Sequence, residues 1–455
     1  MEQASTLEII RRELFHGAAD YTKSLPDLYI PHRFRLIAPS QAGRFLEELR
    51  ASLVEEEILV YLHFPFCFSE CRFCNSFPHK VNREVQDRYV QSLVKEISLF
   101  FDAGVFAGKR ARCVYLGGGT PTSFSMDDIR LVLGTLRSCI ELTDDITCEA
   151  HPSTLENGRR IQAMVDAGIN RISVGCQTFD PAVLEHCNRT HTATQVKKII
   201  DTAREAGART NIDMMTGLPG QSLSSVEGDL EILDRIRPDA IEYIRHEIVN
   251  PLVIALFKSH PELVVGDDEL FEMVYRTQSW LEERGYEQNG RYTTGRQWEY
   301  RYHWLEEMPI IAFGSRARSY TKTMCYDKHE DLPTYFSAIE KGIPPAIRQI
   351  NLTKREQMYR SLLLRLQIRK GVKIRTFQDR FGEDPRIALA RVVKDLEGLG
   401  CLEEADGALR LTRYGSYFVE DICDLIVDAA LKEESKDLGR APHSEGNTSS
   451  RLSLG

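Results

Sequence analysis

The stretch His63-Phe64-Pro65-Phe66-Cys67-Phe68-Ser69-Glu70-Cys71-Arg72-Phe73-Cys74 carries the strongest chemical signal in this sequence. Its cysteines follow the spacing Cys-x3-Cys-x2-Cys, and closely spaced Cys thiolates are the usual ligands of iron–sulfur clusters. Three ligands for a four-iron cluster leave one iron open to a substrate or a cofactor. The alternatives are three unrelated thiols or a structural zinc ion, for which His63 or His79 could supply a fourth ligand.

The composition limits the classes of protein that this chain can represent. Its 455 residues are enough for two or three domains. The net charge of −9 argues against binding nucleic acid through phosphate contacts. No run of about 18 apolar residues predicts a transmembrane segment, and Met1-Glu2-Gln3-Ala4 does not begin a secretory signal. We therefore expect a cytoplasmic protein whose 11 cysteines form no disulfide framework.

Short apolar runs alternate with helical patterns through residues 56–250. In residues 83–103, for example, Tyr89, Leu93, Ile97 and Phe100 recur on one helical face. This alternation predicts parallel strands joined by right-handed crossovers. Six strands are too few for an eight-stranded barrel, so we predict an α/β fold, a partial (β/α)6 barrel. The predicted strands are 58–63, 113–116, 146–150, 172–175, 210–215 and 240–244.

The flanking regions have different patterns. Residues 1–55 are predicted to be an N-terminal extension, and residues 251–350 a mixed, aromatic-rich connecting region. Residues 351–430 show three helical segments and then a hairpin that turns at Asp406-Gly407, the order of a winged-helix-like domain. Residues 431–455 are rich in Ser, Gly and charge and are predicted to be disordered.

Polar residues fall at the carboxyl ends of successive predicted strands, where ligands bind in such folds. Gly117-Gly118-Gly119 follows one strand, and Glu149, Gln177 and Asp213 lie on the next three. A carboxylate inside an apolar strand needs a partner, such as an ammonium group or ribose hydroxyls. Buried ion pairs or hydrogen-bonded core groups are the alternative. Arg189 could hold a carboxylate in bidentate fashion or be an ordinary surface charge.

Taken together, five segments resemble the oxygen-independent coproporphyrinogen dehydrogenase family of radical S-adenosylmethionine (SAM) enzymes. In that family the three cysteines bind a [4Fe–4S] cluster, whose free iron chelates SAM, and an electron from the cluster cleaves SAM to a 5′-deoxyadenosyl radical. The resemblance also implies a low-potential electron donor such as flavodoxin or ferredoxin, and several members bind two SAM molecules. The segments are the Cys67–Cys74 loop, Gly117–Pro121, Arg171–Asp180, Arg189–Thr192 and Asn211–Gln221.

The resemblance carries over to individual positions. Cys67, Cys71 and Cys74 would bind the cluster. One SAM would contact Tyr61, Gly118 and Glu149, and the other would contact Phe73, Gly119, Thr120, Gln177, Arg189 and Asp213.

Two departures from the family pattern bear on the reaction. Dehydrogenases of the family carry a Cys where this chain has Ser76, and its heme chaperones carry a His-Asn pair that is absent before His303-Trp304. By exclusion, the sequence favours a third branch, the class C radical SAM methyltransferases, which use a second SAM to methylate an sp2 ring carbon. An anaerobic coproporphyrinogen III dehydrogenase and a heme-binding chaperone remain the alternatives.

A methyltransferase of this branch would take a planar small-molecule substrate, possible examples being a quinone such as menaquinone or another aromatic ring. Four aromatic residues within residues 298–304 could bind such a ring, or they could be ordinary core packing. These residues are Trp298, Tyr300, Tyr302 and Trp304.

Overall fold

A parallel sheet of six strands forms the centre of the molecule, as predicted. The computed structural model describes residues 2–15, 33–155, 158–288, 293–294 and 299–437. Within these residues the strands pair in chain order and all in parallel. They are β2 (Glu57–Phe64), β5 (Arg110–Gly118), β6 (Glu141–Ala150), β7 (Arg171–Gln177), β8 (Arg209–Thr216) and β9 (Ala240–Arg245).

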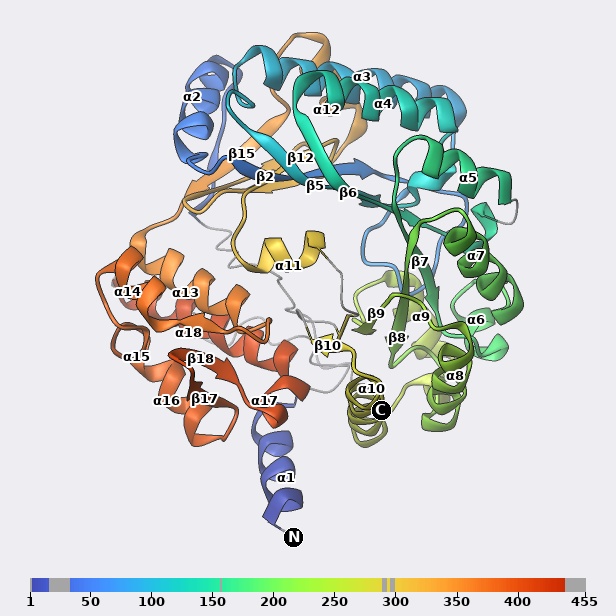
Figure 1. Cartoon of the computed structure of the whole chain (residues 1–455), viewed down its shortest axis with the longest axis vertical. Helices are drawn as coiled ribbons and strands as arrows, with labels where there is room; N and C mark the ends of the chain where they lie inside the picture. The colour runs from blue at the N-terminus through green and yellow to red at the C-terminus, as the bar shows by residue number, and fades with distance from the viewer. Residues whose placement is uncertain (1, 16–32, 156–157, 289–292, 295–298, 438–455) are drawn as a thin grey trace.

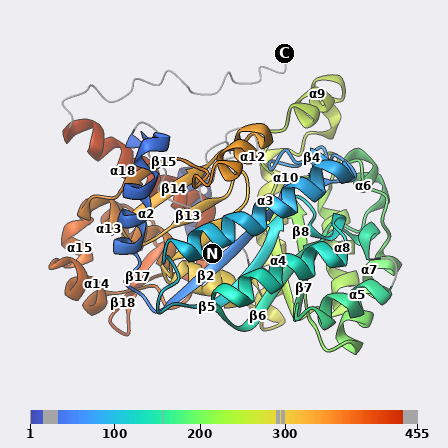
Figure 2. The ribbon, with the colours of Figure 1, turned by 90° about the horizontal axis from the view of Figure 1, so that it is seen from above.

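Helices cover the outer face of this sheet and connect its strands (Figure 1). In α3 the side chains of Tyr89, Leu93, Ile97 and Phe100 are all buried, which confirms the predicted apolar face. Figures 1 and 2 show α3 and α4 lying side by side across the sheet. The covering helices are α3 (Arg83–Asp102), α4 (Met126–Cys139), α5 (Gly158–Asp166), α7 (Ala193–Glu205) and α8 (Leu223–Ile236).

The sheet extends beyond β2 by strands that the sequence did not predict. β12 runs parallel to β2 and pairs Ile310 with Leu59, and the strands that follow it are antiparallel. The sheet therefore ends at β1 on one side and at β9 on the other and does not close. The added strands are β12 (Ile310–Phe313), β13 (Arg318–Tyr320), β14 (Met324–Lys328), β15 (Ala346–Asn351) and β1 (Arg35–Leu36).

The C-terminal region has the predicted winged-helix-like order. Helix α13 (Lys354–Arg365) precedes a three-stranded sheet with the order β16-β18-β17 and further helices. Asp406 and Gly407 both have positive φ angles, 52° and 70°, as a two-residue hairpin turn requires. The other elements are β16 (Val372–Lys373), α14 (Ile374–Phe381), α15 (Pro385–Ala388), α16 (Ala390–Gly398), β17 (Leu402–Ala405) and β18 (Ala408–Leu411).

Two helices close the described part of the C-terminal region, α17 (Arg413–Tyr417) and α18 (Val419–Asp437). Helix α18 continues into the segment predicted to be a tail, and residues 438–455 lie outside the described residues. In the N-terminal segment the structure describes helices α1 (Glu2–Leu14) and α2 (Ala42–Ser52). No helix among the described residues is long and apolar enough to cross a membrane.

Candidate active site

The cysteine loop is fixed by contacts with distant segments of the chain. The strands on either side of the loop, β3 (Phe66–Cys67) and β4 (His79–Lys80), pair with each other in parallel. Side chains from the ends of other elements then donate hydrogen bonds to its carbonyl groups, so its position depends on the folded barrel. These bonds run from Asn188 Nδ2 to Glu70 O (2.8 Å), from Asn250 Nδ2 to Cys74 O (2.7 Å) and from Arg316 Nη1 to Ser76 O (2.8 Å).

All three cysteines of this loop line one cavity of about 400 Å³. Cys67 Sγ lies 3.1 Å from Thr120 Oγ1, and Cys71 Sγ accepts a hydrogen bond from Arg189 Nη1 at 3.4 Å. Burial raises the pKa of the Cys67 thiol to about 12 and also raises that of Cys74. Thiolates here therefore need a strong positive partner, and three thiol donors on one cavity wall fit the ligand set of a [4Fe–4S] cluster.

The two histidines considered as zinc ligands make other contacts. His63 Nδ1 lies 3.2 Å from Tyr61 Oη, and the His79 ring packs against Phe66 with 5.7 Å between centroids. Neither histidine is among the residues that line the cavity. The contacts of His63 and His79 therefore give no support to zinc.

The glycine run brings the turn after β5 against the cysteine loop. Gly119 N donates a hydrogen bond to Phe64 O at 2.9 Å, and Thr120 N donates one to Phe66 O at 2.9 Å. A Cβ at Gly119 would lie 2.8 Å from the backbone of Phe66, closer than real Cβ contacts allow. Gly118 has a φ of 111°, which favours glycine. Close approach of two chain segments thus requires these glycines, although Gly118 and Gly119 also line the cavity.

Glu149 is a partly buried carboxylate on the wall of the cavity. It accepts hydrogen bonds from Tyr115 Oη at 2.8 Å and from Gly118 N at 3.1 Å. Burial, reinforced by the charge of Asp213, raises the pKa of Glu149 to about 7. The ionised carboxylate is therefore costly in this position and would be stabilised by a cationic or hydrogen-bond-donating ligand.

Asp213 lies on β8 with a similar environment. Asn211 Nδ2 and Ser173 Oγ donate hydrogen bonds to it at 2.6 and 3.2 Å. Burial nevertheless raises its pKa to about 6. Its register partner on β9 is Glu242, whose pKa is raised to about 8 by burial and by Asp213. Sequence reasoning missed Glu242, although it carries the same signal as Asp213, a carboxylate within an apolar strand.

Gln177 and Arg189 complete the side of the cavity that faces the loop. Gln177 has a φ of 78°, which is strained for a residue other than glycine, and its buried Oε1 accepts no hydrogen bond from the described residues. Arg189 is 7% exposed, so the interpretation as a surface charge is wrong. It donates to Gly175 O, and its guanidinium lies 5.9 Å from the centre of the Phe73 ring.

The structure thus places every predicted cluster and SAM residue on the wall of this one cavity, and their binding roles stay predictions. The residues are Tyr61, Cys67, Cys71, Phe73, Cys74, Gly118, Gly119, Thr120, Glu149, Gln177, Arg189 and Asp213.

The aromatic residues proposed as a platform for a planar substrate do not line this cavity. Tyr300 and Trp304, on α11 (Glu299–Leu305), are buried in the core, where Tyr300 packs 4.9 Å from the Tyr115 ring centre. Tyr302 packs against Lys370 Nζ, and Trp298 lies outside the described residues. The core-packing interpretation therefore holds for Tyr300 and Trp304.

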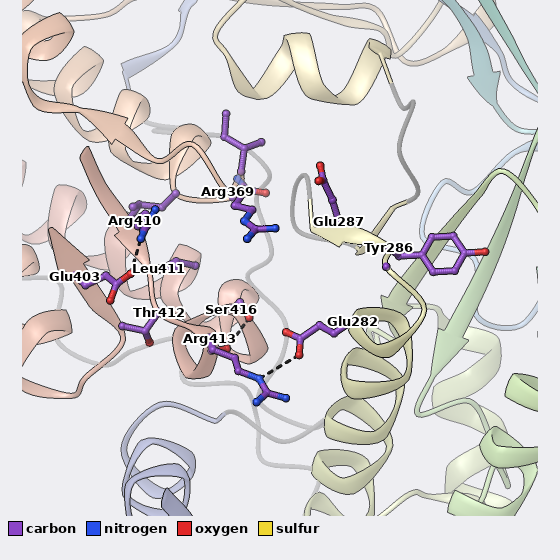
Figure 3. Close-up of a pocket in the computed structure, with 14 residues that line it drawn as sticks. Glu282, Tyr286, Glu287, Arg369, Glu403, Arg410, Leu411, Thr412, Arg413 and Ser416 are labelled. Carbon is purple, nitrogen blue, oxygen red and sulfur yellow. Dashed lines mark hydrogen bonds and ion pairs between the residues drawn. The ribbon is translucent and has the colours of Figure 1, made fainter. Parts of the chain in front are cut away.

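A larger cavity of about 590 Å³ lies between the end of α10 (Asp267–Glu283) and the winged-helix-like domain (Figure 3). Charged side chains on its walls pair with one another, Arg413 with Glu282 at 3.1 Å and Arg410 with Glu403 at 3.0 Å. None of the predicted site residues lines it. The cavity bounded by the cysteine loop is therefore the candidate active site.

Comparisons with known proteins agree with this arrangement. The model of the radical SAM superfamily matches residues 61–233, and that of the HemN C-terminal domain matches residues 352–418. The heme chaperone HemW of Escherichia coli is 32% identical over 233 residues, which are 50% of this chain and 60% of that protein. HemW of Bacillus subtilis is 27% identical over 380 residues, 80% of this chain and 97% of that protein.

The same fold occurs in the solved structure of coproporphyrinogen III oxidase HemN from Escherichia coli. Its TM-score is 0.77 at 21% identity, and the match covers 88% of this chain and 96% of that chain. At this identity the likeness shows the fold alone.

The prediction of a class C methyltransferase, with its menaquinone-like substrate, is wrong. The relatives that match most of this chain are named as a heme chaperone, an anaerobilin synthase and a coproporphyrinogen III oxidase, and the C-terminal region matches the HemN domain. The exclusion relied on single positions. The chain has Ser76 in place of a Cys and lacks a His-Asn pair before His303-Trp304, but the absence of two family markers does not identify a third reaction.

The resemblance to a radical SAM family of the HemN type is confirmed, and with it a [4Fe–4S] cluster and SAM as the implied cofactors. Residues 61–233 resemble the radical SAM superfamily, and residues 352–418 resemble the HemN C-terminal domain.

Proposed function

We propose that this chain is a radical SAM protein that binds a tetrapyrrole, heme in the first instance, and cleaves SAM reductively. The observation that carries the proposal is that three thiols and two partly buried carboxylates, Glu149 and Asp213, line the same cavity. The names of the HemW relatives support heme as the ligand.

The proposed roles follow from the chemistry of each side chain. Cys67, Cys71 and Cys74 would hold the cluster, which when bound supplies the electron that cleaves the sulfonium of SAM. Glu149, with its raised pKa, gains from an ammonium group or from ribose hydroxyls. Arg189 is a fitting partner for a carboxylate.

The other cavity residues would position SAM. The unpartnered Oε1 of Gln177 has room for a ligand donor. The proposal includes two SAM molecules. Tyr61, Gly118 and Glu149 would contact one of them. The other would contact Phe73, Gly119, Thr120, Gln177, Arg189 and Asp213. A low-potential donor such as flavodoxin or ferredoxin would supply the electron.

The test uses the full chain, reconstituted anaerobically with iron and sulfide. Titration with hemin, followed by absorbance in the Soret region, should give a saturable complex. Dithionite and SAM should yield 5′-deoxyadenosine, and Asp213→Ala should reduce that yield while it leaves the iron content unchanged.

A parallel incubation with coproporphyrinogen III separates the two tetrapyrrole functions. Oxidative decarboxylation of that substrate, without saturable hemin binding, would replace the heme proposal by a dehydrogenase. A protein that neither binds hemin nor acts on coproporphyrinogen III would refute the tetrapyrrole proposal.

A further inference from the structure

Arg245 is the point at which the C-terminal region reaches the candidate active site. It ends strand β9 and lines the cavity, and its side chain is only 4% exposed. Its Nη2 lies 3.1 Å from Asp421 Oδ1 and its Nη1 3.4 Å from Oδ2. Its Nε lies 2.9 Å from Glu420 Oε2. The first turn of α18 therefore holds one guanidinium between the buried carboxylate of Asp421 and the partly buried carboxylate of Glu420.

The same guanidinium is enclosed from two further directions. It borders a small cavity of about 30 Å³ that Tyr417, Glu420 and Asp421 line from the C-terminal side. Its Cζ also lies 5.3 Å from the ring centre of Phe15, which follows α1. Arg245 thus forms part of the partition between the active-site cavity and the C-terminal helices, and removal of either carboxylate would loosen that partition.

The segment after Arg245 connects this contact to the cysteine loop. His246 Nδ1 lies 3.1 Å from Gly217 O, which joins the segment to β8. Asn250 Nδ2 donates a hydrogen bond to Cys74 O at 2.7 Å, and Glu247 Oε2 accepts one from Asn75 at 3.2 Å. A few residues therefore separate the ion pair with α18 from the backbone of a predicted cluster ligand.

We propose that Asp421, through Arg245, is a positioning residue for the ligand of this cavity, so that the HemN C-terminal domain is a structural part of the radical SAM site. The proposal rests on SAM binding there, as proposed above. Removing an outer partner of a metal ligand commonly costs 10- to 100-fold in affinity or activity, and we expect a loss at the lower end of that range for an outer partner of Arg245. A displacement of Arg245 at the end of β9 should weaken the affinity for SAM more than it slows the chemical step.

The experiment compares Asp421→Asn with Glu282→Gln in the full, cluster-loaded chain. Glu282 pairs with Arg413 at 3.1 Å, another contact with the C-terminal region, but this pair lines the other cavity (Figure 3). Asp421→Asn should raise the KM for SAM in 5′-deoxyadenosine formation about tenfold, with kcat and iron content nearly unchanged. Glu282→Gln should leave KM at the wild-type value.

A second variant covers the case in which Asp421→Asn does not fold. Glu420→Gln removes one carboxylate and keeps the bidentate pair, so the KM should rise in the same direction by a smaller factor. An unchanged KM in the folded variant, or an equal rise in Glu282→Gln, would overturn the proposal. If the wild type binds hemin but shows no SAM binding or cleavage, the fault lies in the proposed function, and the inference falls with it.

Discussion

Replacing Glu149 with Gln should stabilise the protein at alkaline pH while it weakens SAM binding. The surrounding protein desolvates the Glu149 carboxylate, and this desolvation, together with the charge of Asp213, raises its pKa from 4.5 to about 7. Because the folded-state pKa lies above the unfolded one, the stability associated with the protonated form is complete below about pH 4.5. That stability is lost as the pH rises through about 7.

The magnitude follows from the size of this shift. Each pKa unit corresponds to about 1.4 kcal/mol, so ionised Glu149 costs roughly 3 kcal/mol at pH 8 relative to its protonated form. A glutamine stays neutral but cannot accept from both Tyr115 and Gly118 as a carboxylate does, which costs about 1 kcal/mol. We expect Glu149→Gln to be more stable than wild type by roughly 1–2 kcal/mol at pH 8. It should be slightly less stable at pH 5.

Urea unfolding of the cluster-free protein at pH 5 and pH 8, with and without Glu149→Gln, measures this difference. A stability difference that does not change with pH, or a variant less stable at pH 8, would refute the assigned electrostatics. Because Glu149 ionises as the pH rises through about 7, the affinity of the wild type for SAM should rise over the same range. Glu149→Gln should remove this pH dependence of SAM affinity.

Two further substitutions test the architecture around the cavity. Gly119→Ala should cost about 1–3 kcal/mol of stability and lower the iron content after reconstitution, because its Cβ would lie 2.8 Å from the Phe66 backbone. Gly134→Ala, in open space on α4, is the matched control. Equal iron content in the two variants would contradict this prediction. Glu307→Gln removes a buried carboxylate that pairs with Arg380 at 2.7 Å and Arg365 at 3.0 Å. The free energy of unfolding, measured by thermal unfolding, should fall by about 3–5 kcal/mol, while the iron content stays unchanged. A variant as stable as the wild type would disprove this prediction.

The sequence was sufficient to place the six parallel strands because each is a short apolar run bounded by turns. It did not reveal the strands added beyond β2. Their pairing joins residues far apart in the chain, such as Ile310 with Leu59, and the strands themselves are short. No local pattern records such a partner, so region 251–350 showed only mixed character.

Tyr61 and Phe73 came from the family resemblance, whereas Glu149, Gln177 and Asp213 were predictable because polar groups at the ends of parallel strands converge on one edge. The left-handed conformation of Gln177 and the clamp of α18 on Arg245 were not, since both depend on tertiary contacts. The prediction of a class C methyltransferase was wrong for a different reason. The prediction relied on two absences, of a Cys at Ser76 and of a His-Asn pair before His303-Trp304, and an absent residue does not indicate which reaction the remaining residues support.

The central claim is that three cysteines hold a cluster that cleaves SAM. Electron paramagnetic resonance of the anaerobically reconstituted, dithionite-reduced protein tests it most directly, recorded with and without SAM. We predict a [4Fe–4S] signal that changes shape when SAM is added, together with 5′-deoxyadenosine in the same sample, and loss of both in Cys67→Ala. A signal that SAM leaves unchanged, or a protein that binds zinc in place of iron, would contradict the account.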